Sequence, residues 1–348
     1  MGSPTTFPPL TQRAWFLTGP TASGKSTIAV CLAQHLDLEI LSLDSMTVYR
    51  RMDLGTAKPA AALQQQTVHH LLDQVDPDTE FSAAQYLETA HAAVDQIVGR
   101  GKLPLFVGGT PLYLKACLRG FDAGPPADWE FRKAIEEELR EHGAEALRAR
   151  LQQVDPLSAH QLHPNDTRRM IRALEVARLT GQPISHRQVQ FEASHSADEA
   201  NVYALHWPRN LLHQRIDRRV EQMFADGLVD EVAAIRRDFP TISRTALQAV
   251  GYKEVFEFLD GTIDLSTTID QVKAHTRQLA RRQETWLRSM SEVQFIEMDE
   301  QRTHEDVAAE ILQRSRDRKG PGTTTSENDL PTPDTDSQDS DAGSAPDA

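Results

Sequence analysis

The stretch that decides the fold is GPTASGKS at residues 19–26, which fits the phosphate-binding pattern G-x-x-x-x-G-K-[ST] throughout. A short apolar run, Ala14–Thr18, precedes it, and a helical pattern from Gly24 to Leu36 follows it. Between a strand and a helix, such a loop turns backbone N–H groups toward an anion, and the helix dipole favours negative charge. The predicted cradle consists of Gly19, Pro20, Thr21, Ala22, Ser23, Gly24, Lys25 and Ser26. Lys25 is expected to reach the outer phosphate and Ser26 to hold Mg²⁺; a glycine-rich turn without a ligand is the alternative.

Strands and helices alternate along most of the chain. Further apolar runs of strand length lie at Leu38–Leu43, Leu103–Val107, Asn201–Trp207 and Val293–Met298. Helical periodicity is seen from Ser82 to Ile97, and long helices are expected at about 210–237 and 266–289. Strands separated by helices favour a parallel sheet that is covered on both faces. The predicted fold class is α/β, with a P-loop NTPase-like parallel sheet core flanked by helices.

A block without convincing strands interrupts this alternation. Helices are expected at Asp128–His142, at Ala144–Val154, after the Asp155-Pro156 cap and at Asp166–Leu179, which ends near Gly181. We therefore predict an all-α insertion domain at residues 124–198. The core would comprise residues 1–123 and 199–316, and residues 317–348 would form a disordered acidic tail, because they hold almost no apolar side chains.

The charge of the chain restricts its partners. The net charge is −14, and half of it comes from seven acids that follow Gly320 without any Lys or Arg. A nucleic-acid partner therefore needs a local basic patch. The two cysteines, Cys31 and Cys117, have no metal or disulfide spacing and are expected to be reduced core thiols. No apolar run approaches the roughly 18 residues of a membrane span, and no secretory signal is evident, so we expect a cytoplasmic protein without a membrane partner.

The edge of the sheet near the cradle offers few acids. Many P-loop enzymes bind a nucleotide and transfer a phosphoryl group, and they place an Asp after a later strand to organise Mg²⁺. Here the strand at Leu103–Val107 is followed by Gly108-Gly109-Thr110 and carries no acid. The best acid is Asp44, directly after Leu38–Leu43. Since ligands bind at the carboxyl edge of such sheets, Asp44 and Thr110 should face the cradle, with Thr110 also capping the next helix.

Several short motifs follow one another in a fixed order. They are GPTASGKS at 19–26, DSMTVY at 44–49, MDLGTAKP at 52–59, HHLLD at 69–73, GGTPLY at 108–113, HPND at 163–166, RR at 168–169, GYKE at 251–254, TRQLARRQ at 276–283 and WLR at 286–288. Together, over about residues 14 to 298, they resemble the tRNA dimethylallyltransferase family, in its bacterial form without a zinc finger. Each piece alone is weak, but the joint match is specific.

The resemblance implies an enzyme, a tRNA prenyltransferase. It would move a dimethylallyl group from dimethylallyl diphosphate to the N6 amine of the adenosine immediately 3′ of the anticodon, at position 37. Its partners would be dimethylallyl diphosphate and the tRNA anticodon stem-loop, its cofactor would be Mg²⁺, and it would act as a monomer. By the same resemblance, Asp44 is the general base, Thr21 and Arg219 also act at the reacting centre, and Arg215 joins the cradle in binding the donor.

The resemblance also implies a tRNA-binding set. It consists of Asp44, Ser45, Met46, Thr47, Thr110, Arg132, Arg168, Arg169, Met170, Ile171, Arg172, Arg277, Arg281, Arg282 and Arg288. Three of the arginines, Arg277, Arg281 and Arg288, lie near one helix face with Trp286 beside them, which suits phosphates and a stacked base. A generic arginine-rich surface helix is the alternative reading.

Two other functions stay open at this stage. A P-loop kinase for a small molecule or nucleotide would turn over ATP without tRNA. A tRNA-binding protein without catalysis would keep its function when Asp44 is replaced. The pair His69-His70 could suggest a metal, but adjacent histidines rarely bind one ion alone and no third ligand is evident.

Overall fold

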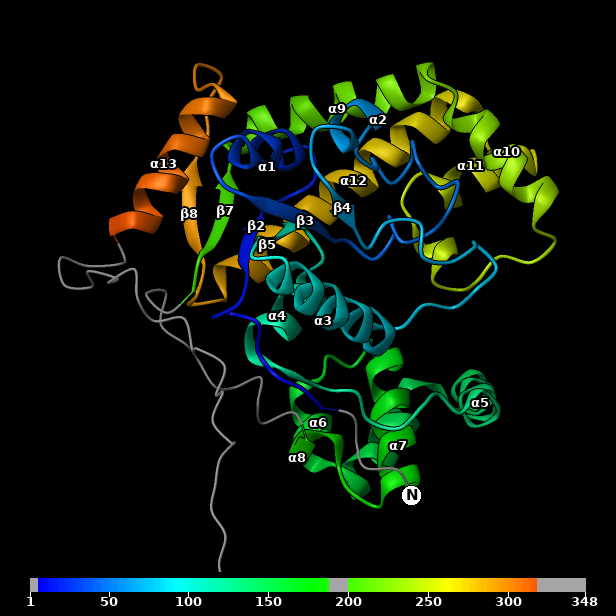
Figure 1. Ribbon diagram of the computed structural model, residues 1–348. Helices are drawn as coiled ribbons and strands as arrows, with labels where there is room; N and C mark the ends of the chain where they lie inside the picture. The colour runs from blue at the N-terminus through cyan, green and yellow to red at the C-terminus, as the bar shows by residue number, and fades with distance from the viewer. Residues whose placement is uncertain (1–5, 188–199, 318–348) are drawn as a thin grey trace, which may run out of the picture.

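A computed structural model describes residues 6–187 and 200–317 of the chain. Its main sheet has six parallel strands in the order β4-β3-β5-β2-β7-β8 (Figure 1). The strands are β2 (Trp15–Thr18), β3 (Leu38–Leu43), β4 (His69–His70), β5 (Leu103–Gly108), β7 (Val202–His206) and β8 (Gln294–Glu297). The predicted α/β class and five of these strands are confirmed. The sixth, β4, is a two-residue edge strand that the sequence pattern did not predict.

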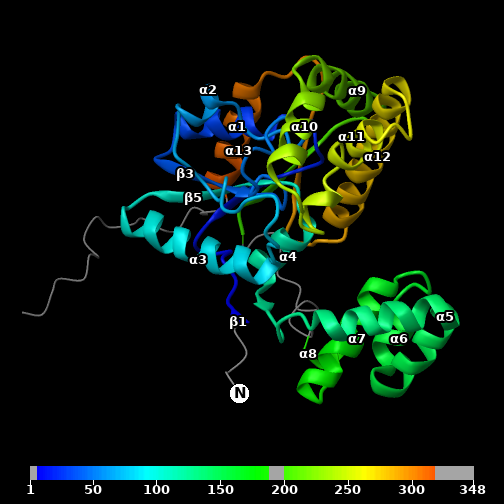
Figure 2. The same ribbon diagram turned by 90° about the vertical axis from the view of Figure 1, so that its right-hand side faces the viewer.

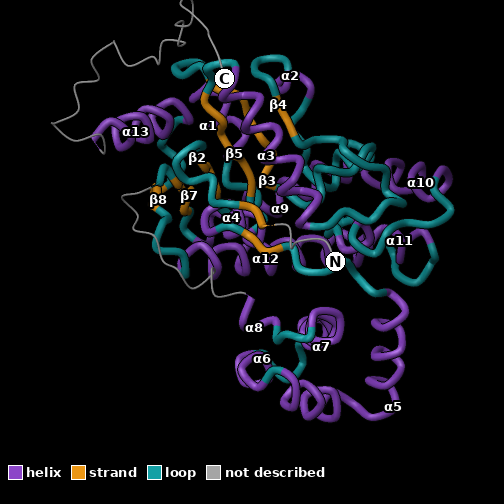
Figure 3. Tube along the Cα trace, turned by 60° about the horizontal axis from the view of Figure 1, so that its bottom comes forward, coloured by secondary structure: helices purple, strands orange, loops and turns teal. Residues whose placement is uncertain are grey.

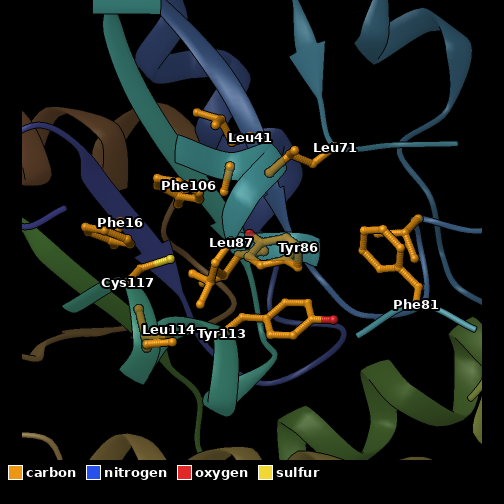
Figure 4. Close-up of a cluster of buried hydrophobic side chains, with 14 of the residues drawn as sticks. Phe16, Leu41, Leu71, Phe81, Tyr86, Leu87, Phe106, Tyr113, Leu114 and Cys117 are labelled. Carbon is orange, nitrogen blue, oxygen red and sulfur yellow. The ribbon is translucent and has the colours of Figure 1, made fainter. Parts of the chain in front are cut away.

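Helices cover both faces of the sheet. On one face α1 (Lys25–Ala33) packs against β2, β3 and β5 and is itself covered by α13 (His304–Asp317). On the other face lie α3 (Ala83–Gly99) and α4 (Pro111–Arg119). Between α3, α4 and the sheet, the rings of Tyr86 and Tyr113 stack with centroids 3.9 Å apart beside Phe16, Phe106 and Cys117 (Figure 4). Both cysteines are buried free thiols, as expected.

A layer of helices crosses the carboxyl edge of the sheet, where the cradle lies. It contains α9 (Arg209–Ala225), α10 (Leu228–Asp238), α11 (Tyr252–Leu259) and α12 (Leu265–Arg288). The prediction of one helix over 210–237 is wrong. The chain turns at Gly227, whose φ of 102° lies in the left-handed region that glycine adopts without strain. The short elements α2 (Ala61–Gln64), η3 (Ala246–Gln248) and the β1–β6 ribbon (Thr6–Phe7 and Phe121–Asp122) complete the core.

The insertion is helical, as predicted. It consists of α5 (Trp129–Val154), α6 (Pro156–Gln161), α7 (Thr167–Thr180) and α8 (Ile184–Arg187), which share a hydrophobic cluster of their own. Figures 2 and 3 show these helices beside the sheet core and connected to it near α4. The Asp155 carboxylate caps α6 by accepting from the Ser158 N–H, and Gly181 ends α7 in the left-handed conformation. The domain boundaries stay predictions, and the acidic tail beyond Asp317 lies outside the described residues.

None of the helices in the described ranges is both long enough and apolar enough to cross a membrane.

Candidate active site

Side chains of other elements support the loop that forms the phosphate cradle. Gly24 ends the loop with a φ of 98°, after which α1 begins. Two of the loop's carbonyl oxygens accept from outside it: Arg215 Nε donates to the Ala22 oxygen at 2.9 Å, and Trp207 Nε1 donates to the Ser23 oxygen at 3.0 Å. The Arg215 guanidinium also lies 4.2 Å from the centre of the Trp207 ring. The first N–H groups of α1, which follow the loop, have no partner within the helix and suit an anion.

Arg215 does not take the position expected for a donor ligand. Its Nε is committed to the back of the loop, and it lines neither of the cavities at this edge of the sheet. The contact of Arg215 with the donor stays a prediction, and the contact that Arg215 makes in the structure supports the cradle. Its neighbour one helical turn on, Arg219, lines both cavities. Within the described part of the chain, no hydrogen-bond or ion-pair partner is found for Arg219, although its side chain is half-buried.

The cations at the cradle are destabilised in the absence of an anion. Lys25 Nζ donates to the carbonyl oxygens of Gly19 (3.0 Å) and Pro20 (2.7 Å), which lie in its own loop. Burial, and next the charge of Arg219, lower the pKa of Lys25 to about 7, against a smaller opposing effect of Asp44. Burial and the neighbouring Arg215 also lower the pKa of Arg219. An anionic ligand would supply the charge that both groups lack.

Asp44 lies across the same cavity from the cradle, directly after β3. Its Oδ1 accepts the N–H of Met46 at 2.8 Å and the N–H of Thr47 at 3.3 Å. Burial raises the pKa of the Asp44 carboxyl, while the two N–H groups and the Lys25 charge act in the opposite direction. A carboxylate with a raised pKa accepts a proton more readily than an exposed one, which suits the general-base prediction.

The residues after Asp44 form a tight turn, and this turn is tied to β5. Ser45 donates its N–H to Thr110 Oγ1 at 3.1 Å. Thr110 occupies the N-cap position of α4, but its side chain makes no capping bond. The prediction that Thr110 caps the helix is therefore wrong, since its hydroxyl is used across the site. The Thr47 hydroxyl is buried against Ser42 Oγ at 2.8 Å, and Met46 packs on the core.

Two adjoining cavities lie in front of the cradle. The smaller has a volume of about 90 Å³, and the polar side chains that line it include Lys25, Ser26, Arg219 and Asp44. Apolar side chains also line it, among them Ala29, Ile40, Pro59, Leu72 and Val107. The larger has a volume of about 430 Å³ and is again lined by Lys25, Ser26 and Arg219. Cationic and apolar side chains around one small cavity fit a ligand with a charged head and a short apolar body.

Gln283 is a site residue whose role the sequence did not reveal. It lies on α12 with 6% of its surface exposed and lines the smaller cavity. Its Oε1 accepts the Thr21 N–H at 2.9 Å, and its Nε2 donates to the Gly109 oxygen at 2.7 Å. Thr21 itself also lines that cavity, as predicted for a residue close to the donor. The motif TRQLARRQ contains Gln283, but no local pattern links it to a loop 262 residues away.

Not all of the α12 arginines that were predicted to bind tRNA are available on the surface. Arg277 is half-buried and forms an ion pair with Asp217 of α9, so it holds two helices together. In contrast, Arg281, Arg282 and Arg288 are exposed, and none of their guanidinium groups has a hydrogen-bond partner within residues 6–187 and 200–317. Trp286 beside them is 40% exposed, with Lys115 Nζ 5.8 Å from the centre of its ring.

Four of the six residues predicted to bind tRNA on the insertion serve its packing. Met170 and Ile171 have 0% and 5% of their surface exposed in the insertion's hydrophobic cluster, so the prediction that their side chains bind tRNA is wrong. Arg132 makes two 2.7 Å hydrogen bonds to the buried carboxylate of Glu175, and Arg172 pairs with the same carboxylate. That network joins α5 and α7.

The other two arginines of the insertion lie on its surface. Arg168 donates to Gln248 Oε1 of the core at 3.0 Å, and Arg169 pairs with Asp166 at the start of its own helix. The Arg168 side chain therefore connects the insertion to the core segment that precedes the GYKE motif at residues 251–254.

Binding of a divalent cation at the cradle would depend on the phosphate oxygens of the ligand. Throughout the two described ranges, no three His, Cys, Asp or Glu side chains are grouped so that they could hold a metal ion. Ser26 lines both cavities at the position where a phosphate would lie. Mg²⁺ usually keeps several waters and binds through one or two protein groups plus phosphate oxygens, so the Ser26 hydroxyl fits such an ion. His70 is engaged otherwise, because its Nε2 contacts Glu39 at 2.7 Å.

Comparison with known proteins independently supports the family resemblance seen in the sequence motifs. The family model for IPP transferase matches residues 47–290. The chain belongs to the IPP transferase family. It is 55% identical over 295 residues to a tRNA dimethylallyltransferase of Rhodopirellula baltica, covering 82% of this chain and 88% of that protein. A tRNA dimethylallyltransferase of Thiobacillus denitrificans is 46% identical over 277 residues, covering 79% and 88%.

Solved structures of IPP transferase family proteins share the fold. The tRNA isopentenylpyrophosphate transferase of Bacillus halodurans has a TM-score of 0.63 at 36% identity, covering 88% of this chain and 98% of that one. A eukaryotic dimethylallyltransferase, captured acting on tRNA, has a TM-score of 0.74 at 25% identity, covering 90% of this chain and 81% of that one. The predicted family and the α/β fold with a P-loop are thus confirmed.

Proposed function

We propose that this protein transfers a dimethylallyl group from dimethylallyl diphosphate to the N6 amine of adenosine 37 in tRNA. The observation that carries this proposal is the set of side chains around one small cavity. The cations Lys25 and Arg219 line it together with the carboxylate of Asp44 and several apolar side chains. The cations suit a diphosphate head and the apolar side chains suit a five-carbon body, and the reacting carbon would lie close to Asp44.

The cradle would stabilise the leaving group. As the bond between the allylic carbon and the diphosphate oxygen breaks, negative charge grows on that oxygen. Lys25 and Arg219 both line the cavities beside the loop, so together with N–H groups of the loop they would stabilise this charge. Mg²⁺, when bound through the diphosphate and Ser26, would neutralise further charge there.

Asp44 would act on the nucleophile. The exocyclic amine of adenine is weakly nucleophilic, because its lone pair is delocalised into the ring. When its nitrogen forms the new bond to the allylic carbon, the amine must lose a proton, and the carboxylate of Asp44 can accept it. The N–H groups of Met46 and Thr47 fix the Asp44 carboxylate in place. The products are N6-(dimethylallyl)adenosine and diphosphate.

The tRNA would bind on the exposed basic residues around this cavity. Arg281, Arg282 and Arg288 of α12 are free for phosphates, and Trp286 offers a ring for stacking. Arg168 and Arg169 contribute from the insertion. The adenine must leave its stack in the anticodon loop to reach Asp44, as other base-modifying enzymes require.

The test is transfer of labelled dimethylallyl diphosphate to an unmodified tRNA with an adenosine-rich anticodon loop, in the presence of Mg²⁺. Wild-type protein should incorporate label at the adenosine. Asp44→Asn should still bind the tRNA, but it should incorporate label much more slowly than wild type. Phosphate release from ATP by folded protein, without label on the tRNA, would instead support a kinase.

A further inference from the structure

Gln283 joins the two halves of the active site. The P-loop follows β2, and Gly109 follows β5, which is the neighbouring parallel strand. The side-chain amide of Gln283 spans the gap between them with one acceptor and one donor, to the Thr21 N–H (2.9 Å) and the Gly109 oxygen (2.7 Å). The bond to Gly109 is buried and the bond to Thr21 is partly buried, so competition with water is reduced at both.

The chemistry of the bridge is specific to glutamine. A glutamate could accept from the Thr21 N–H, but its second oxygen would face the Gly109 oxygen without a proton to donate. Gly109 is matched to the bridge, because a Cβ on that residue would lie 2.5 Å from Gln283 Nε2 and 3.0 Å from the Gly19 oxygen. The two loops approach one another this closely only with a glycine at position 109.

The bridge continues to the residue proposed as the base. Thr110 follows Gly109 and accepts the Ser45 N–H at 3.1 Å. Ser45 follows Asp44, whose carboxylate accepts the next two N–H groups of the same turn. A displacement of Gly109 would therefore move the turn that carries Asp44 relative to the P-loop that carries Lys25.

We propose that Gln283 is a positioning residue that fixes the distance between the donor cradle and Asp44. This inference rests on the proposed function, because it concerns the same cavity. It predicts that loss of the bridge slows bond formation far more than it weakens tRNA binding. A misplacement of about 1 Å at a reacting centre costs on the order of 10²-fold in rate.

The experiment compares Gln283→Glu and Gln283→Met with wild type and with Gln278→Met. Gln278 is an exposed glutamine on the same helix, so its variant controls for the loss of a helical glutamine. Methionine matches the length of glutamine without hydrogen bonding, and glutamate matches its shape without the donor. Single-turnover transfer to tRNA, the Kd for tRNA and thermal unfolding are measured for each.

Both Gln283 variants should lose about 10- to 100-fold in the single-turnover rate, with the Kd for tRNA within about threefold of wild type. Gln278→Met should match wild type. Full activity of Gln283→Met would overturn the inference, because packing alone would then suffice. A parallel loss of tRNA affinity, or Gln283 variants that do not fold, would also overturn it, since Gln283 would then serve α12 as a whole. Failure of wild type to label tRNA would instead remove the proposed function.

Discussion

Binding of the diphosphate should draw a proton onto Lys25. In the ligand-free protein, burial and the nearby charge of Arg219 lower the pKa of Lys25 to about 7. A bound diphosphate places negative charge against the ammonium and returns its pKa toward the ordinary range of roughly 10. As the pH rises through about 7, the free protein loses this proton while the complex keeps it. Donor affinity should therefore be fully present below that pH and fall above it.

The size of the effect follows from the pKa of about 7. At a pH of about 8, roughly one free molecule in eleven carries the proton on Lys25. Binding must then be about tenfold weaker than at low pH, which corresponds to about 1.4 kcal/mol, and it must take up about 0.9 of a proton. The diphosphate itself is almost fully ionised at this pH and contributes little to the uptake.

Calorimetry can measure this uptake directly. A thiolodiphosphate analogue of the donor, which reacts slowly, is titrated at a pH of about 8 into the protein in buffers that differ in ionisation enthalpy. Lys25→Arg is the matched control, because its guanidinium stays charged in this range. Wild type should take up close to one proton more than Lys25→Arg. Equal uptake by the two proteins would refute the linkage, and with it the assignment of Lys25 to the diphosphate.

Three further substitutions test the base, the insertion and the RNA surface. Asp44→Asn should lower the single-turnover rate by about 10²- to 10⁴-fold and abolish the loss of rate that wild type shows as the pH falls through the raised pKa of Asp44. Glu175→Ala should destabilise the protein by about 3 kcal/mol in denaturant unfolding, because it leaves two half-buried arginines without the buried carboxylate that they share. Replacing Arg281 and Arg282 by alanine should weaken tRNA binding and reduce its log–log salt slope by about 0.7–0.9 per lost phosphate contact, whereas Arg277→Ala should leave that slope unchanged.

Sequence reasoning succeeded where local pattern decides structure. The strand β3 matches its apolar run from Leu38 to Leu43 residue for residue, and α3 begins directly after Ser82, where the helical periodicity starts. The cradle was likewise predicted from one contiguous motif, whose glycines determine its backbone. These features depend on residues within one or two turns of each other, so a single sequence contains all the information they need.

Sequence reasoning failed where contacts between distant segments determine the role of a residue. Met170 and Ile171 follow Arg168-Arg169 in the sequence, and the family resemblance placed all four in the tRNA-binding set. On a helix, however, consecutive residues face different directions, and these two face the insertion's core. Arg277 likewise follows the stripe of α12 but meets Asp217 of another helix. Such partners appear only when the packing of the helices is known.

The architecture also explains how a P-loop could serve carbon chemistry. In a kinase, the loop and a later acidic strand surround the phosphorus atom that is attacked. Here β5 ends at Gly108 and is followed by Gly109, and the space next to the loop is a small cavity with several apolar side chains in its wall. Under the proposed function, the same N–H groups and lysine would face the group that departs, and Asp44, which also lines the cavity, would face the nucleophile. An acid that follows β3 in place of one that follows β5 would then serve attack on an allylic carbon and not on phosphorus.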